Sequence, residues 1–466
     1  MTVRGKIRIK RAAFAGLLLC ALASVALSQA KHPVIFIPGL TGSELRNPTT
    51  KERIWFSAFK PKSGRIALTV DADPLKMHDG LVPTDVIRSV KVGFLKFDIY
   101  GGFIKALAAR GGYHEEKWDK PTAKGGDAAV YVFAYDWRQD NVSNARLLIR
   151  KIDELRKKLG KPDLKFDIVA HSMGGIVARY AAMYGDADLA TAGQKPHPTW
   201  AGAKYFDQIV LIGTPNEGAM NSFNAMVNGF EYKGLRIDLP FFQDTSKYMV
   251  FSIPAAYQLL PAPGALRAFD DQLKPLDIDL YDPTTWTKYG WDVTRDANFV
   301  EHFTASERRV ADAYFANALS RAKRLHEALS AANGNAKGVS FYSVGGDCKK
   351  DTPDGVVVYQ DRSGGWNSQF DPAGFTRADG SKVSDADVAK VVLSPGDSIV
   401  AFHSVNASMQ SKNAGVPSIF AGHATENVCA EHNTQATNRG IQDYVIRILT
   451  GIAVTPKQLT ATSRPQ

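Results

Sequence analysis

Six residues around Ser172 have the types and spacing of a serine nucleophile. The run Ala170–Gly175, with the sequence AHSMGG, lies between an apolar, β-branched segment and a segment of helical character. A strand, a sharp turn and a helix would hold Ser172 exposed above a sheet, where its hydroxyl can attack a carbonyl carbon. Small residues must flank such a turn, and Ala170, Gly174 and Gly175 do. We therefore predict a nucleophile here rather than an ordinary surface serine.

Attack by a serine on an ester leaves a negative charge on the carbonyl oxygen, and backbone N–H groups must stabilise it. One donor is the N–H of the residue after the nucleophile, Met173. The second usually comes from the loop after an early strand, here Pro38–Ser43, whose glycines allow close approach. We predict the N–H of Leu40 as this donor and that of Thr41 as the alternative. A purely structural turn is the competing interpretation.

The base that activates the serine is expected to follow it in the order serine, acid, histidine. Of the ten histidines, only His403, His423 and His432 come late enough in the chain. The base belongs in the loop between the last strand and the final helix, which disfavours His403. His432 lies closer to the start of that helix than His423, and its position favours it.

Three aspartates compete for the role of the acid that orients the histidine. Asp397 lies in a tight turn, SPGDSIV, upstream of the candidate histidines. Asp351 and Asp354 lie nearer the end of a strand predicted at 339–344, where the acid loop normally begins. By position alone all three remain candidates.

The elements that must position these groups alternate between buried strands and amphipathic helices. This alternation predicts an α/β fold with a mostly parallel central sheet flanked by helices. Strands are expected at 33–37, 129–133, 165–170, 206–212, 339–344 and 417–421, and helices at about 148–159, 306–332 and 441–448. One catalytic domain, 31–466, with a cap insertion at about 217–335 and a late hairpin insertion at about 346–395, explains the pattern without a second domain.

The predicted cap is rich in aromatic residues. They form either an apolar wall for acyl chains or the core of the insertion itself, and the pattern does not decide between these interpretations. The residues are Phe223, Phe230, Tyr232, Phe241, Phe242, Tyr248 and Phe251.

The N-terminus has the features of a secretory signal peptide at residues 1–30. Five basic residues precede the uncharged stretch Ala12–Leu27, and a small-x-small pattern ends at Ala30. Cleavage after Ala30 is preferred over lipidation at Cys20 or an uncleaved anchor. We therefore expect an exported protein, periplasmic or secreted. In that oxidising setting a disulfide between Cys348 and Cys429 is predicted, with two separate thiols as the alternative.

The formal charge of +10 suggests an anionic partner, but half of it belongs to the predicted leader. Residues 31–466 contain 52 Lys and Arg against 47 Asp and Glu, or +5. This mild excess is compatible with peripheral contact to a lipid surface. The basic residues near 150–158 read as a solvated helix face, so nucleic acid is not an expected partner. A serine mechanism needs no metal or cofactor, and the sequence contains neither His/Cys ligand spacing nor a phosphate-binding G-x-x-x-x-G-K-[ST] loop.

Motifs along the chain resemble those of the lecithin:cholesterol acyltransferase and phospholipid:diacylglycerol acyltransferase group of α/β-hydrolases. The most specific is Tyr135–Arg138, YDWR, because general lipases lack it. The others are Pro33–Leu40 with Gly42-Ser43, Trp55-Phe56, Gly112-Tyr113, Ala170–Gly175, Gly213–Pro215, Leu259–Pro261, Gly396-Asp397 with Val400, and His432. The chain departs from the group in having Ser398-Ile399 where Gly-Thr is usual, and in lacking a cysteine pair between 51 and 91.

The resemblance implies the acid Asp397 and the base His432 beside the nucleophile Ser172. It further implies acyl transfer from a phospholipid or related ester lipid through an acyl-serine intermediate, with an alcohol or water as acceptor. A phospholipase A or carboxylesterase that uses only water is one alternative. A non-catalytic lipid-binding or partner-binding protein on a hydrolase fold is an alternative of another class.

Overall fold

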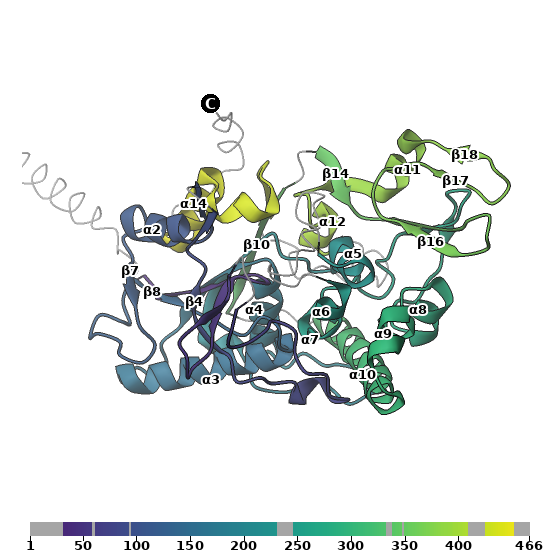
Figure 1. Ribbon diagram of the computed structural model, residues 1–466. Coiled ribbons are helices and arrows are strands. Elements are labelled where there is room, and N and C mark those ends of the chain that lie inside the picture. The colour runs from purple at the N-terminus through teal and green to yellow at the C-terminus, as the bar shows by residue number, and fades with distance from the viewer. Residues whose placement is uncertain are drawn as a thin grey trace, which may run out of the picture.

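A seven-stranded parallel sheet forms the centre of the protein (Figure 1). The computed structural model describes residues 31–57, 61–92, 95–230, 246–331, 338–346, 349–408 and 425–451. The predicted leader, Cys348, His423 and the strand expected at 417–421 lie outside these ranges. The strand order is β20-β13-β10-β9-β1-β8-β7, and every pairing within this sheet is parallel. The strands are β1 (Val34–Ile37), β7 (His114–Glu116), β8 (Ala129–Val132), β9 (Phe166–His171), β10 (Phe206–Ile212), β13 (Ser340–Gly345) and β20 (Thr425–Asn427).

Alternate residues of each central strand enter two different apolar layers, because successive side chains point to opposite faces of a sheet. In β1, Val34 and Phe36 pack with α2 (Gly101–Ala109) and α14 (Arg439–Leu449). Ile35 and Ile37 pack on the other face with α3 (Asn141–Leu159) and α4 (Met173–Tyr184). Figure 1 shows α2 and α14 on the side of the sheet opposite α3. Helices on both faces of a parallel sheet confirm the predicted α/β architecture, which fits an α/β-hydrolase fold.

A helical cap leaves the sheet after β10 and returns to it at β13. Its helices are α5 (Met220–Asn228), α6 (Lys247–Phe251), α7 (Pro254–Tyr257), α8 (Pro283–Tyr289), α9 (Ala297–His302) and α10 (Ala305–Ser330). Phe223 packs edge-on against Trp286, Trp291 and Phe370, and the ring of Phe251 contacts Tyr314. These two aromatic residues therefore belong to the core of the cap. Tyr232, Phe241 and Phe242 lie outside the described residues.

A second, four-stranded sheet joins the cap to the segment between β13 and β20. Its order is β12-β11-β15-β16, with β12 (Pro275–Leu276) and β11 (Ala268–Phe269) from the cap, and β11 pairs in parallel with β15 (Val356–Gln360). This segment is more elaborate than a single hairpin. It also contains β14 (Lys349–Pro353), β16 (Trp366–Gln369), β17 (Phe375–Thr376), β18 (Lys382–Val383), α11 (Asp385–Val392) and β19 (Leu393–Gly396). Antiparallel pairing of β14 with β19 brings the two ends of this segment together.

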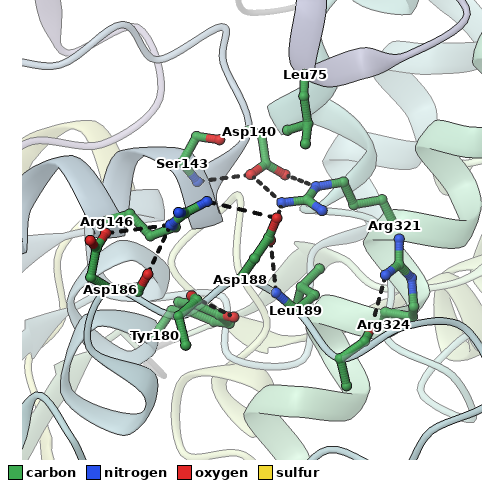
Figure 2. A network of polar contacts seen from close by, with 12 residues as sticks. Leu75, Asp140, Ser143, Arg146, Tyr180, Asp186, Asp188, Leu189, Arg321 and Arg324 are labelled. Carbon is green, nitrogen blue, oxygen red and sulfur yellow. Dashed lines mark hydrogen bonds and ion pairs between the residues drawn. The ribbon is translucent and has the colours of Figure 1, made fainter.

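A buried ion-pair network fastens the cap helix α10 to the sheet domain (Figure 2). The Arg321 guanidinium donates to both carboxylate oxygens of Asp140, at 2.8 and 3.0 Å, and to Asp188 at 2.7 Å. Asp140 also accepts from the N–H of Ser143 and thereby caps α3. The base of the cap is thus tied to the helix that follows the YDWR motif.

Among the described residues, no helix is both long enough and apolar enough to cross a bilayer.

Candidate active site

Ser172 occupies a strained turn between β9 and α4. Its backbone has φ 53° and ψ −127°, a conformation that costs an L-residue on the order of 1–3 kcal/mol. The residue sits at the N-terminus of α4, and its N–H donates to the carbonyl oxygen of Ile212 at the end of β10. The turn thus projects Ser172 at the carboxyl ends of the strands, as the strand-turn-helix pattern predicts.

Glycines are required around this turn because the backbone of another loop passes very close to it. A Cβ atom on Gly174 would lie 2.5 Å from the carbonyl oxygen of Pro38. A Cβ atom on Gly39 would lie 2.8 Å from the Cβ of Ser172. These approaches press the Pro38–Ser43 loop against the serine.

The structure brings Ser172, His432 and Asp397 into one hydrogen-bonded chain. His432 Nε2 lies 2.8 Å from Ser172 Oγ, and His432 Nδ1 lies 2.8 Å from Asp397 Oδ2. Both the histidine and the aspartate are buried. His432 opens a short 3₁₀ helix, His432–Thr437, directly before α14, and its N–H donates to the carbonyl oxygen of Asp397 at 2.8 Å. This geometry lets the imidazole accept the serine proton while the carboxylate fixes its tautomer.

Asp397 stays ionised in this site because its carboxylate oxygens accept several hydrogen bonds. Burial raises the pKa of its carboxyl group, but the charge and hydrogen bond of His432 outweigh burial, together with the N–H groups of Val400 and Ile399. The net effect holds the pKa of Asp397 below its ordinary value. Gln435 Nε2 adds a hydrogen bond of 2.8 Å to Asp397 Oδ2. Sequence reasoning missed Gln435, although its place three residues after His432, on the same short helix, is a local signal.

The competing histidine and aspartate form a separate ion-pair cluster. His403 contacts Glu217 Oε2 at 3.0 Å and Asp354 Oδ1 at 2.9 Å. Arg267 donates to the other oxygen of Asp354 at 2.6 Å. Asp354 is therefore occupied with His403 and Arg267, and Asp351 lies exposed on β14.

The N–H groups predicted to stabilise the oxyanion are available. Within the part of the chain that the structure describes, the N–H groups of Leu40, Thr41 and Met173 donate no hydrogen bond. Thr41 has φ 62°, and the N–H of Gly42 donates to the carbonyl oxygen of Gly39, closing a tight turn around Leu40 and Thr41. Both loop residues thus remain candidates for the second donor.

The YDWR motif braces the candidate oxyanion loop. The hydroxyl of Tyr135 donates to the carbonyl oxygen of Pro38 at 2.8 Å, and the N–H of Tyr135 donates to Ser43 Oγ at 3.2 Å. Trp137 packs edge-on against Trp55, whose Nε1–H donates to the carbonyl oxygen of Thr41 at 2.7 Å. The first and third residues of the motif therefore support the loop that faces Ser172.

Arg138, the last residue of the YDWR motif, ties the segment that contains Ile66 and Asp79 to the sheet domain. The side chain of Arg138 is fully buried and makes paired hydrogen bonds to Asp136 and to Asp79. It also donates to the carbonyl oxygen of Ile66. A bidentate guanidinium suits this double role better than a lysine, because it supplies several fixed donors.

Cys429 is disulfide-bonded in the structure. Its predicted partner, Cys348, lies outside the described residues, so this pairing stays a prediction. No group of three or more His, Cys, Asp or Glu side chains within the described ranges is arranged to hold a metal ion.

Comparison with known proteins links this site to a family. The family model described as lecithin:cholesterol acyltransferase matches residues 123–309, which include the YDWR motif and Ser172 but end before Asp397 and His432. Phospholipid:diacylglycerol acyltransferase 1 of Arabidopsis thaliana is 27% identical over 210 residues, 40% of this chain and 28% of that protein. The uncharacterized protein YJR098C of Saccharomyces cerevisiae is 31% identical over 152 residues, 31% of this chain and 20% of that protein. The matches thus cover less than a third of either curated relative.

Among solved structures, the crystal structure of the Tle4-Tli4 complex contains a similar fold. The alignment covers 91% of this chain and 99% of that one, with a TM-score of 0.51 and 17% sequence identity. The likeness extends to the cap as well as to the central sheet. This structural likeness shows the fold, while the family model and the plant relative show that residues within this chain are similar to the lecithin:cholesterol acyltransferase and phospholipid:diacylglycerol acyltransferase family.

Proposed function

We propose that the protein is a serine enzyme that removes an acyl group from a phospholipid or related ester lipid and passes it to an alcohol or to water. The observation that carries this proposal is the chain Asp397–His432–Ser172, with both connecting distances at 2.8 Å. The plant relative is named for acyl transfer between a phospholipid and diacylglycerol, which supports a lipid ester as the substrate class.

The site suits acyl transfer in two balanced steps. His432 Nε2 takes the proton of Ser172 Oγ as that oxygen attacks the ester carbon, and the N–H groups of Met173 and Leu40 receive the oxyanion. Collapse of the intermediate breaks the ester C–O bond, and the imidazolium gives its proton to the departing alkoxide. In the second step an alcohol or water attacks the acyl-serine and loses its proton to His432. The bond between the acyl carbon and Ser172 Oγ then breaks, the imidazolium returns the proton to Ser172 Oγ, and the new ester or the free acid is released.

A product assay with Ser172→Ala tests the proposal. The purified protein is incubated with labelled phospholipid, with and without a sterol or diacylglycerol, and the products are identified by mass. We expect products from the wild type and from Ser343→Ala, which removes another buried serine hydroxyl on β13, and none above background from Ser172→Ala. Retained ester cleavage by Ser172→Ala would refute the proposal.

The same assay separates transfer from hydrolysis. An ester of the added alcohol assigns the protein as a transferase, and free fatty acid alone assigns it as a phospholipase or carboxylesterase. If the folded wild type forms no product and a fluorophosphonate probe does not label Ser172, the non-catalytic interpretation replaces the proposal.

Export is a further part of the proposal, supported by the basic and apolar pattern of residues 1–30. We expect mature protein from the periplasm or culture medium to begin at Lys31. N-terminal sequencing measures this, and a mature chain that retains the leader would contradict it.

A further inference from the structure

Two buried side chains that the proposed mechanism does not use lie between the candidate oxyanion loop and His432. Tyr100, just before α2, has its hydroxyl 3.1 Å from the N–H of Gly39 and 2.9 Å from His171 Nδ1. His171 Nε2 in turn lies 3.2 Å from the carbonyl oxygen of His432. Tyr100 is 4% exposed and His171 is 6% exposed.

The hydrogen bonds that connect Gly39, Tyr100, His171 and His432 allow only one arrangement of protons. The carbonyl oxygen of His432 only accepts, so His171 must carry its proton on Nε2. Its Nδ1 is then an acceptor and receives the hydroxyl proton of Tyr100. The N–H of Gly39 only donates, and it donates to the remaining lone pair of Tyr100 Oη. These hydrogen bonds therefore all point in one direction, from the Pro38–Ser43 loop to the backbone of His432.

Both side chains keep the protonation states that this arrangement needs. Burial lowers the pKa of His171 to about 3, with the neighbouring His432 contributing, so the His171 ring is neutral. Burial raises the pKa of Tyr100 to about 12, so its hydroxyl keeps its proton. A neutral His171 also spares His432 a second positive charge when the base becomes an imidazolium during the reaction. The two histidine rings are only 4.9 Å apart between centroids.

We propose that Tyr100 and His171 are positioning residues that hold the Pro38–Ser43 loop at the right distance from His432. By engaging the N–H of Gly39, Tyr100 turns that donor away from the substrate, leaves the next N–H groups of the loop for the oxyanion and fixes their height above Ser172. His171 carries the same constraint to the peptide unit of His432. The inference rests on the proposed function, since an oxyanion forms only if Ser172 attacks an ester.

Tyr100→Phe removes the hydroxyl and keeps the ring, which packs edge-on against Phe36 at 5.1 Å. The matched control is Tyr113→Phe, which removes another buried tyrosine hydroxyl. That hydroxyl donates to the carbonyl oxygen of Leu449 and takes no part in the hydrogen bonds among Gly39, Tyr100, His171 and His432. Each variant is assayed for hydrolysis of a short p-nitrophenyl ester, for inhibition by a trifluoromethyl ketone that forms a hemiketal oxyanion, and for its melting temperature.

We expect Tyr100→Phe to lower kcat by about 10- to 100-fold relative to Tyr113→Phe, with KM within about twofold, because misplaced oxyanion donors weaken only the charged states. The inhibition constant of the ketone should rise by the same factor, while the melting temperatures of the two variants stay close. A merely structural role would not move the ketone affinity in step with kcat.

The inference is overturned if Tyr100→Phe matches Tyr113→Phe in kcat, or if its kcat falls while the ketone binds as before. If Tyr100→Phe does not fold, His171→Leu decides, because leucine offers neither an acceptor for the Tyr100 hydroxyl nor a donor to the carbonyl oxygen of His432. The same parallel loss supports the proposal, and unchanged ketone affinity refutes it. If instead the folded wild type forms no product from labelled phospholipid and a fluorophosphonate probe does not label Ser172, the proposed function is refuted, and this inference with it.

Discussion

Replacing Asp397 by asparagine changes one atom, and the contacts of that atom predict a large effect. Asp397 Oδ1 accepts from the N–H groups of Ile399 and Val400 at 3.1 and 2.7 Å, and Oδ2 accepts from His432 Nδ1 and Gln435 Nε2 at 2.8 Å each. Because backbone N–H groups can only donate, the asparagine must keep its carbonyl oxygen on their side. Its NH₂ group therefore takes the place of Oδ2 and faces His432.

A donor at this place forces the wrong tautomer on the histidine. His432 Nδ1 must then accept, so the ring proton moves to Nε2, which faces Ser172 Oγ and can no longer take its proton. The charge opposite the developing imidazolium is also lost, and two unit charges about 4 Å apart interact by roughly 4 kcal/mol at an effective dielectric constant near 20. We expect kcat/KM to fall by about 10³- to 10⁴-fold, or roughly 4–5.5 kcal/mol in the activation barrier.

The stability of Asp397→Asn should change little. The two backbone N–H bonds persist, and Gln435 can rotate its amide so that Oε1, which has no partner among the described residues, accepts from the new NH₂ group. The loss should therefore appear in kcat/KM for a p-nitrophenyl ester and not in the melting temperature.

Asp354→Asn is the matched control, since Asp354 is also a buried aspartate paired with a histidine but contacts His403. This variant should lose stability and keep its rate per folded molecule. The reasoning is refuted if Asp397→Asn retains more than about a tenth of the wild-type kcat/KM. A collapse of activity in folded Asp354→Asn would move the acid role to that residue.

Two further predictions concern pH and packing. Burial lowers the pKa of His403, but Asp354 and Glu217 outweigh burial and raise it to about 9. The folded-state pKa is thus above the ordinary value of 6.5, so this cluster stabilises the protein fully below about pH 6.5 and loses its effect as pH rises through about 9. The free energy of urea unfolding should fall over this window in the wild type and less in His403→Gln, and identical slopes would contradict the assignment. Separately, Gly39→Ala places a methyl group 2.8 Å from Ser172 Cβ and should slow fluorophosphonate labelling by at least about tenfold, whereas Gly365→Ala, which meets no atom closer than 3.4 Å, should leave the labelling rate unchanged.

The nucleophile turn was predictable because its requirements are local. Strand, turn and helix around Ser172 are neighbours in the chain, and the small residues flanking the serine report the crowding directly. The alternating strands and helices likewise predicted the α/β fold, and the structure and the comparisons confirm it. The strand expected at 417–421 lies outside the described residues, and the described edge strand β20 begins at Thr425.

The sequence only partly identified the base and the acid that act with Ser172. Chain order reduced the base to a few late histidines, and position with the family resemblance favoured His432 and Asp397. Their meeting with Ser172, 260 residues from His432, is a property of the folded sheet and its loops. The same holds for β11 and β15, whose pairing merges the two insertions into one sheet.

Residue types and short-range spacing alone determined the elbow, the fold class and a short set of candidates for each role. Tertiary structure decided that Asp354 pairs with His403, that the YDWR motif braces the Pro38–Ser43 loop, and that Tyr100 and His171 connect this loop to His432. The physical reason is that a buried polar group must find its partner wherever the packed chain places one. Periodicity reports which face of an element is buried, but it carries no information about which distant donor or acceptor will meet that face.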